Sequence, residues 1–134
     1  RGMHFQTQEP QSKLVRALTG EIYDVAVDLR KDSLTFGKWA GFYLNSTNHK
    51  ALFIPAGFAH GFLVISDTAL VSYKCTGRFL SEFDTGITWN DSDIAIEWPV
   101  NLVSKIITSE KDMKLQSFKS FCKNQCLTTD TKEQ

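Results

Sequence analysis

The segment from Phe53 to Phe62 constrains the fold more than any other part of the sequence. Pro55 has no N–H and Gly57 can adopt positive φ, so a tight corner is expected there. The apolar run 58–65 that follows is typical of a buried strand. Such a strand would carry the imidazole of His60 into a β-barrel. A core histidine satisfied by a backbone carbonyl is the structural alternative, and it stays open at this point.

Alternating apolar and polar residues predict further strands around this segment. The clearest pattern runs from Glu21 to Arg30, after a predicted hairpin turn at Thr19-Gly20. Its apolar face contains Tyr23, Val25, Val27 and Leu29. Residues 3–6 alternate in the same way at the start of the chain, which places His4 and Gln6 on one face.

The remaining strands are predicted at regular spacing between turn residues. They cover residues 13–18, 38–45, 69–76, 87–89 and 94–98, the last stopped by Pro99. Ser109 begins a weak capping box, which predicts one C-terminal helix. One face of this helix would contain Leu115, Phe118, Phe121 and Cys122. The tail from Thr128 is expected to fray. Many short strands without a helix in the first hundred residues indicate an all-β sandwich or jelly roll.

The composition is that of an ordinary globular domain. The chain has 134 residues, of which 42% are hydrophobic, and no apolar run is long enough to cross a bilayer. Lys and Arg balance Asp and Glu at 15 each, so no nucleic-acid-binding surface is expected. The odd set Cys75, Cys122 and Cys126 predicts neither a disulfide framework nor a zinc ribbon, and a reducing cytoplasm fits it best.

Five titratable side chains lie on or beside the predicted elements, where a barrel interior normally carries Val, Ile and Leu. They are His4, Lys13, His60, Tyr73 and Asp112. This much polarity calls for a partner or a ligand. Taken singly, Lys13 could open a strand with its amine in solvent, and Tyr73 could be an edge aromatic with a solvated hydroxyl. Asp112 could simply stabilise a helix start.

The Pro-x-Gly-x-x-His pattern that ends at His60 resembles the second short motif of cupins, small double-stranded β-helices that bind ligands in the barrel mouth. Many cupins hold iron or manganese with two or three histidines and a carboxylate. The first cupin motif requires His-x-His with a downstream Glu, whereas His4 is followed by Phe5 and Gln6. We therefore expect no metal site.

Eight blocks in register resemble successive blocks of the dTDP-4-dehydrorhamnose 3,5-epimerase family. They are residues 1–6, 13–16, 24–30, 33–37, 54–62, 73–74, 89–91 and 109–112. The resemblance implies a cupin jelly roll with a short C-terminal helix, forming one epimerase domain over residues 1–134. It implies a cytoplasmic enzyme without metal or cofactor, which inverts carbons beside the 4-keto group of a nucleotide-linked 4-keto-6-deoxy sugar in dTDP-rhamnose synthesis. The expected partners are that sugar and a second copy in a homodimer, with no nucleic acid and no membrane.

The resemblance also assigns roles to the catalytic candidates. His4 matches the base that removes a proton beside the ketone, and Asp112 matches the carboxylate that orients this base. Lys13 matches a cation near the enolate oxygen, and Tyr73 matches the acid on the opposite ring face. The expected substrate-binding residues are Arg1, Gln6, His60 and Phe79.

Three features limit this interpretation. Regular alternation would point Arg1 away from His4, so we expect a backbone bulge at Gly2. Arg78-Phe79 replaces the paired tyrosines usual in the family, which removes one hydroxyl from the expected pocket. The family's N-terminal strands, which help to bind the nucleotide, are expected to be missing. A single-centre epimerase, a ketoisomerase relative and a non-catalytic cupin sugar-binding module therefore stay open as alternatives.

Overall fold

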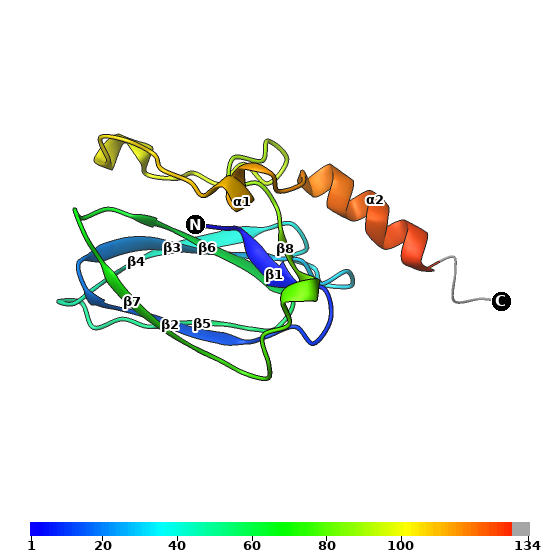
Figure 1. Ribbon diagram of the computed structural model, residues 1–134, viewed down its shortest axis with the longest axis horizontal. Helices are drawn as coiled ribbons and strands as arrows, with labels where there is room; N and C mark the ends of the chain where they lie inside the picture. The colour runs from blue at the N-terminus through cyan, green and yellow to red at the C-terminus, as the bar shows by residue number, and fades with distance from the viewer. Residues whose placement is uncertain (130–134) are drawn as a thin grey trace.

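The computed structural model describes residues 1–129 and contains two antiparallel sheets that face each other (Figure 1). The five-stranded sheet has the order β4-β3-β6-β1-β8 and the three-stranded sheet β5-β2-β7. The strands are β1 (His4–Gln6), β2 (Lys13–Thr19), β3 (Glu21–Asp28), β4 (Trp39–Asn45), β5 (Leu52–Ile54), β6 (Phe58–Val64), β7 (Leu70–Cys75) and β8 (Asp84–Gly86). This arrangement confirms the predicted all-β cupin jelly roll.

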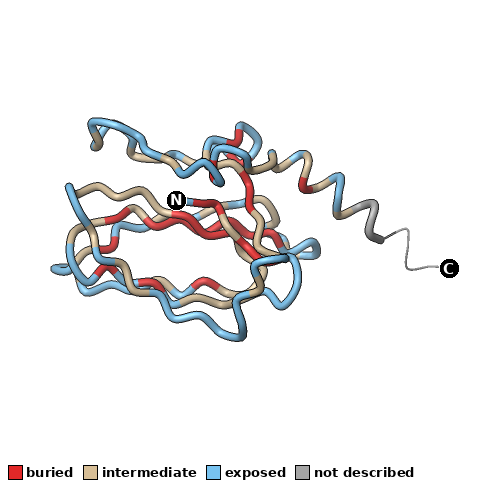
Figure 2. The backbone as a smooth tube through the Cα atoms, in the orientation of Figure 1, coloured by how far each residue is buried: buried red, intermediate tan, exposed pale blue. Residues whose placement is uncertain are grey.

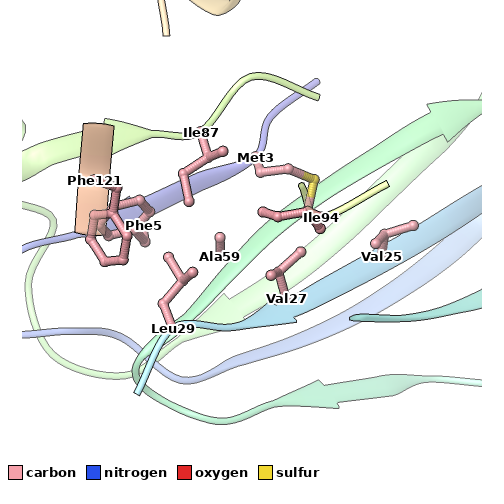
Figure 3. Packing of buried hydrophobic residues seen from close by; sticks show 9 residues of the cluster. All are labelled: Met3, Phe5, Val25, Val27, Leu29, Ala59, Ile87, Ile94 and Phe121. Carbon is pink, nitrogen blue, oxygen red and sulfur yellow. The ribbon is translucent and has the colours of Figure 1, made fainter. Parts of the chain in front are cut away.

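β3 lies between β4 and β6 and is buried on both faces. Its outward side chains Val25 and Val27, with Leu29 directly after the strand, belong to a core outside the five-stranded sheet. Figure 3 shows the cluster that they form with Met3, Phe5, Ala59, Ile87, Ile94 and Phe121. Its inward side chains include Ile22 and Ala26, which pack between the sheets against Val15, Ala17, Leu44 and Ile54. The predicted alternation of β3 is therefore confirmed.

The outer core is closed by the C-terminal arm, residues 87–129, which runs along the outer face of the five-stranded sheet (Figure 1). The arm contains a 3₁₀ turn, η2 (Val100–Leu102), and two helices, α1 (Glu110–Met113) and α2 (Phe118–Thr129). Phe121 of α2 meets Phe5 of β1 edge to face, with ring centroids 5.2 Å apart. Figure 2 shows that the buried residues follow the strands, whereas many of the connecting loops are exposed.

The turn at Gly20 joins strands of different sheets. Gly20 has the positive φ of 72° that the predicted turn requires. However, β2 pairs with β5 and β7, whereas β3 pairs with β4 and β6. The predicted Thr19-Gly20 hairpin is therefore wrong, because the local sequence specifies a reversal but not the strands that pair after it.

The arm also differs from its prediction in three places. The strand expected over 87–89 lies at Asp84–Gly86, in β8, and residues 94–98 form no strand. Asp91 accepts hydrogen bonds from the backbone N–H groups of residues 93 and 94 at 3.0 Å, and Ala95 has a φ of 52°, so a turn replaces the strand. The single predicted helix is split, because Gln116 bridges to Ile87 and holds residues 114–117 outside helical geometry.

Two local predictions about backbone geometry are confirmed. Gly57 has a φ of 87° at the corner before β6, and Ser109 caps α1 by accepting the N–H of Asp112 at 3.1 Å. The backbone also departs from strand geometry at Gly2, where φ is 108°. A Cβ at Gly2 would lie 2.6 Å from the backbone of residues 60 and 61, so only glycine fits. The tail that was expected to fray from Thr128 is still helical at Thr129, where α2 ends. The rest of that tail and the thiol of Cys126 lie outside what is described.

Asp28 ends β3 and anchors the loop that follows it. Its carboxylate accepts hydrogen bonds from the hydroxyls of Ser33 and Thr35, each at 2.6 Å, and from the guanidinium of Arg30 at 2.8 and 2.9 Å. The hydrogen bonds from Arg30 are the largest cause that holds the pKa of Asp28 well below its ordinary value, although burial opposes them.

We predict that Asp28→Asn lowers the free energy of unfolding by about 2–4 kcal/mol near pH 7, because a buried and multiply bonded carboxylate is lost. A carboxylate whose pKa is lower in the folded state than in the unfolded state stabilises the fold at pH values above its unfolded-state pKa of about 3.9. This stabilisation is lost as the pH falls toward the folded-state pKa. The difference between wild type and variant should therefore shrink below about pH 4 in urea titrations. Asp32→Asn, at an exposed position of the same loop, is the matched control, and equal effects of the two would contradict the assignment.

Candidate active site

A cavity of about 440 Å³ opens between the two sheets. All eight residues that the sequence predicted as site residues border it. They are Arg1, His4, Gln6, Lys13, His60, Tyr73, Phe79 and Asp112. They come from four strands, the chain start, the loop after β7 and helix α1, so the fold brings together blocks that are far apart in the sequence.

His4 is placed by the alternation of β1. Its neighbours in the sequence, Met3 and Phe5, belong to the outer core. His4 therefore points to the opposite side, where the cavity lies. Its Nε2 lies 2.6 Å from Oδ1 of Asp112, and the two side chains are 19% and 1% exposed. The backbone N–H of Gly2 donates to the other carboxylate oxygen of Asp112 at 3.1 Å. The carboxylate is therefore bonded on both oxygens and holds the imidazole in one orientation.

The electrostatics of this pair favour a neutral imidazole beside a carboxylate. Burial lowers the pKa of His4 from its ordinary value, although the hydrogen bond and the charge of Asp112 oppose the shift. Burial acts to raise the pKa of Asp112, but the hydrogen bonds from Gly2 and His4 outweigh it and leave that pKa below its ordinary value. Such a pair can accept a proton from a bound molecule near neutral pH.

A second imidazole–carboxylate pair lies beside the first. His60 stands opposite His4 in the register of β1 and β6, and its Nε2 is 2.6 Å from Oδ1 of Asp24 on β3. Both side chains are buried, so a carboxylate rather than a backbone carbonyl satisfies this histidine. Sequence reasoning missed Asp24. The available signal was a carboxylate between Ile22 and Ala26 on the inward face of a strand.

The opposite wall of the cavity comes from the three-stranded sheet. Lys13 opens β2 opposite Cys75 of β7, and Tyr73 lies two residues before Cys75 on the same face. Burial lowers the pKa of the Lys13 ammonium, with Cys75, Asp84 and Asp24 acting in the opposite direction. An imidazole from one sheet and an ammonium and a phenol from the other therefore border the same cavity.

The predicted binding residues border the cavity at different depths, since Gln6 and His60 are buried whereas Arg1 and Phe79 are exposed. Gln6 accepts the N–H of Leu80 at 2.8 Å and donates to the backbone oxygens of residues 9 and 78 at 3.0 and 3.3 Å. Its amide therefore holds the loop that carries Phe79, whose ring is mostly exposed. Arg1 borders the cavity from the chain start, beside the bulge at Gly2.

Sequence reasoning also missed an ion pair beside His4. Asp84 and Lys111 border the cavity and bind each other. The charge of Asp84 raises the pKa of His4 and that of Lys111 lowers it. Lys111 lies within the 109–112 block and could have been found there, whereas Asp84 precedes the strand expected in this region.

Neither a metal site nor a membrane span is found in the part of the chain that the structure describes. Among the side chains that the structure describes, no three of His, Cys, Asp or Glu gather as a possible metal site. Over the same described residues, no helix combines the length and the apolar character needed to cross a membrane.

Comparisons with known proteins point to one family. The family described as dTDP-4-dehydrorhamnose 3,5-epimerase matches residues 1–120. The protein of that name from Methanothermobacter thermautotrophicus is 56% identical over 84% of this chain and 60% of its own length. That from Escherichia coli is 53% identical over 86% of this chain and 62% of its own length. The chain thus spans less than two thirds of these curated relatives.

Solved structures agree with this similarity. The dTDP-4-dehydrorhamnose 3,5-epimerase of Elizabethkingia anophelis superposes with a TM-score of 0.85 and 44% identity, covering 90% of this chain and 66% of that one. The dTDP-6-deoxy-D-glucose-3,5-epimerase of Legionella pneumophila, in complex with dTDP-4-keto-L-rhamnose, superposes with a TM-score of 0.85 and 44% identity. This match covers 89% of this chain and 62% of that one. The similarity therefore includes the sheets that border the cavity.

We predict that the imidazole of His4 titrates below the ordinary value of about 6.5 and that Asp112→Asn lowers its pKa further. The reason for the second shift is that the hydrogen bond and charge of Asp112 both favour the protonated ring. Imidazole NMR signals followed against pH measure this, with His4→Gln to assign the signal. Asp67→Asn, an exposed carboxylate in the turn after β6, should leave it unchanged. A rise in the Asp112→Asn variant would contradict the assigned electrostatics.

Proposed function

Since the chain belongs to the dTDP-4-dehydrorhamnose 3,5-epimerase family, we propose that it inverts C3, C5 or both in a dTDP-4-keto-6-deoxyhexose through an enolate. The observation that carries the proposal is the arrangement of the cavity walls. His4 with Asp112 stands on one side, and Lys13 with Tyr73 stands on the other. Inversion at a carbon requires proton removal from one face and proton return to the opposite face.

The first step is removal of a proton beside the ketone by His4. A carboxylate only accepts hydrogen bonds, so Nε2 of His4 carries the hydrogen that faces Asp112, and Nδ1 has the free lone pair. The proton moves from the sugar carbon to Nδ1, and the C–H electrons form the enolate. Asp112 stabilises the resulting imidazolium, and the ammonium of Lys13 offsets the charge on the enolate oxygen.

The second step is protonation from the other face. The hydroxyl of Tyr73 gives its proton to the same carbon, which restores the ketone with inverted configuration. His4 then loses its proton to solvent and the phenolate of Tyr73 regains one, so the reaction balances as an isomerisation. No electrons are transferred to or from another molecule. His4 and Tyr73 carry out the two proton transfers at the carbon, and exchange with solvent restores both side chains.

A single-centre epimerase is the second candidate, favoured by Phe79. Its exposed ring borders the cavity but carries no hydroxyl, where the resemblance implies a tyrosine. One fewer polar group would leave fewer ways to hold the sugar in two successive orientations. Position-resolved hydrogen exchange distinguishes the candidates, because a single-centre enzyme exchanges one carbon only.

We predict that His4→Ala lowers solvent deuterium incorporation into dTDP-4-keto-6-deoxyglucose by at least about 100-fold at every carbon.

Tyr73→Phe should keep exchange while losing net inversion, because proton removal and enolate stabilisation do not need the phenol. Mass spectrometry and proton NMR of the recovered sugar measure exchange and configuration separately. His49→Ala, at an exposed turn, is the control that should keep both.

Two outcomes would overturn this assignment of roles. Exchange near the wild-type rate in His4→Ala would remove His4 as the base. Equal loss of exchange and inversion in Tyr73→Phe would mean that Tyr73 binds the substrate or the enolate instead of returning the proton. A wild-type protein that binds the sugar without any exchange would favour the non-catalytic module.

We also propose that the protein is a cytoplasmic homodimer that joins through the three-stranded sheet. β5 and β7 are the edges of this sheet within the described chain, and unpaired edges favour association. The outward face is unusually apolar, because Leu14 and Phe53 stand opposite each other and both are exposed. A second copy with the same face would bury these side chains.

Sedimentation velocity at micromolar concentration should give a dimer. Phe53→Lys should shift the distribution toward monomer because it places two charges in the buried contact. Leu34→Lys, at an exposed loop position away from this sheet, should leave the distribution unchanged. Monomer alone in the wild-type protein would contradict the proposed assembly.

A further inference from the structure

Two blocks that had no assigned role, residues 24–30 and 33–37, meet in one hydrogen-bond network around Asp28. The carboxylate accepts hydrogen bonds from the hydroxyls of Ser33 and Thr35. It accepts three more from Arg30, from the backbone N–H at 3.0 Å, from Nε at 2.9 Å and from Nη2 at 2.8 Å. Asp28 is 1% exposed. None of these four residues belongs to the cavity wall as described, so the network acts on a ligand only through other residues.

Arg30 connects the network to the cavity wall. Its guanidinium carbon lies 4.8 Å from the centroid of the Phe58 ring. Its methylene groups cover Gly57, because a Cβ at Gly57 would lie 2.7 Å from Cγ of Arg30. The N–H of Leu29 also donates to the carbonyl of Gly57 at 3.1 Å. Gly57 and Phe58 both border the cavity, so Arg30 supports this wall from behind.

The network fixes an arginine that would otherwise be mobile. The side chain of Arg30 is 49% exposed, and a long side chain at such a position normally samples several rotamers. Here Nε and Nη2 bind the two oxygens of one buried carboxylate, which sets the plane of the guanidinium. A planar group held in this way limits the positions that the Phe58 ring can adopt.

The same wall leads directly to His60. Phe58 is the first residue of β6 and stands opposite Asp28 in the register with β3. His60 follows two residues later and therefore points to the same side of the sheet. The corner at Gly57, the ring of Phe58 and the imidazole of His60 thus form one continuous surface of the cavity.

We propose that Asp28 and Arg30 are positioning residues that hold the Gly57 and Phe58 wall in its ligand-binding position. The kinetic consequence rests on the proposed epimerase function. Loosening this wall weakens sugar binding but leaves proton transfer intact, because His4, Lys13 and Tyr73 come from β1, β2 and β7, whereas the positioning residues belong to β3 and the loop after it. Arg30 therefore acts on KM more than on kcat.

The test uses Arg30→Lys, which keeps the positive charge and an aliphatic chain but loses the planar guanidinium that binds both oxygens of Asp28. KM for dTDP-4-keto-6-deoxyglucose should rise about 5- to 10-fold, while kcat stays within about twofold. Lys123→Arg, the reverse exchange at an exposed position of α2, is the matched control and should change neither. Thr35→Val, which removes one hydrogen bond to Asp28 but leaves the guanidinium, should raise KM less than Arg30→Lys.

Measurements well below the melting temperature separate positioning from simple stability. A lower Tm for Arg30→Lys with unchanged KM would overturn the proposal. A second readout does not need catalysis. With carbon-13-labelled Phe and His in the ligand-free protein, the ring signals of Phe58 and His60 should shift in Arg30→Lys and not in Lys123→Arg. Unchanged ring signals would overturn the proposal even if the wild type had no epimerase activity.

Discussion

The hydrogen bond between His4 and Asp112 is the interaction on which the rest of the structure depends. It joins β1 to α1, and the N–H of Gly2 strengthens the connection on the second carboxylate oxygen. The C-terminal arm is thereby fixed across the five-stranded sheet, where Ile94 and Phe121 complete the outer core. One buried carboxylate therefore both closes the fold and orients the proposed base, so the site can form only when the arm is in place.

Burial of β3 on both faces is the second constraint. Its outward side chains must be apolar to meet the arm, while its inward side is free to carry carboxylates as long as each has a partner. Asp24 meets His60 and Asp28 meets Arg30, and both carboxylates are almost fully buried. The same strand thus supplies apolar packing, the carboxylate of a buried imidazole–carboxylate pair and the anchor of the cavity wall. A change at any inward position of β3 is expected to affect the cavity as well as stability.

The alternation in residues 3–6 and 21–30 predicted which side chains face inward, because burial on a strand repeats every second residue. The sequence could not show that Asp24 meets His60, since pairing across strands depends on a register that no local pattern specifies. For the same reason it placed β2 and β3 in one hairpin. The strand predicted at 94–98 failed because the side chain of Asp91 binds the next backbone N–H groups more locally than any neighbouring strand could.

The burial that lowers the pKa of His4 and Lys13 also explains why the proposed reaction suits this cavity. A partly buried site disfavours isolated charges, yet the proposed first step creates two new ones, an imidazolium and an enolate. Each forms next to an opposite charge that is already present, since Asp112 lies 2.6 Å from His4 and Lys13 stands on the opposite wall. The transition state therefore gains two favourable pairings that the ground state lacks, which is the condition for electrostatic catalysis.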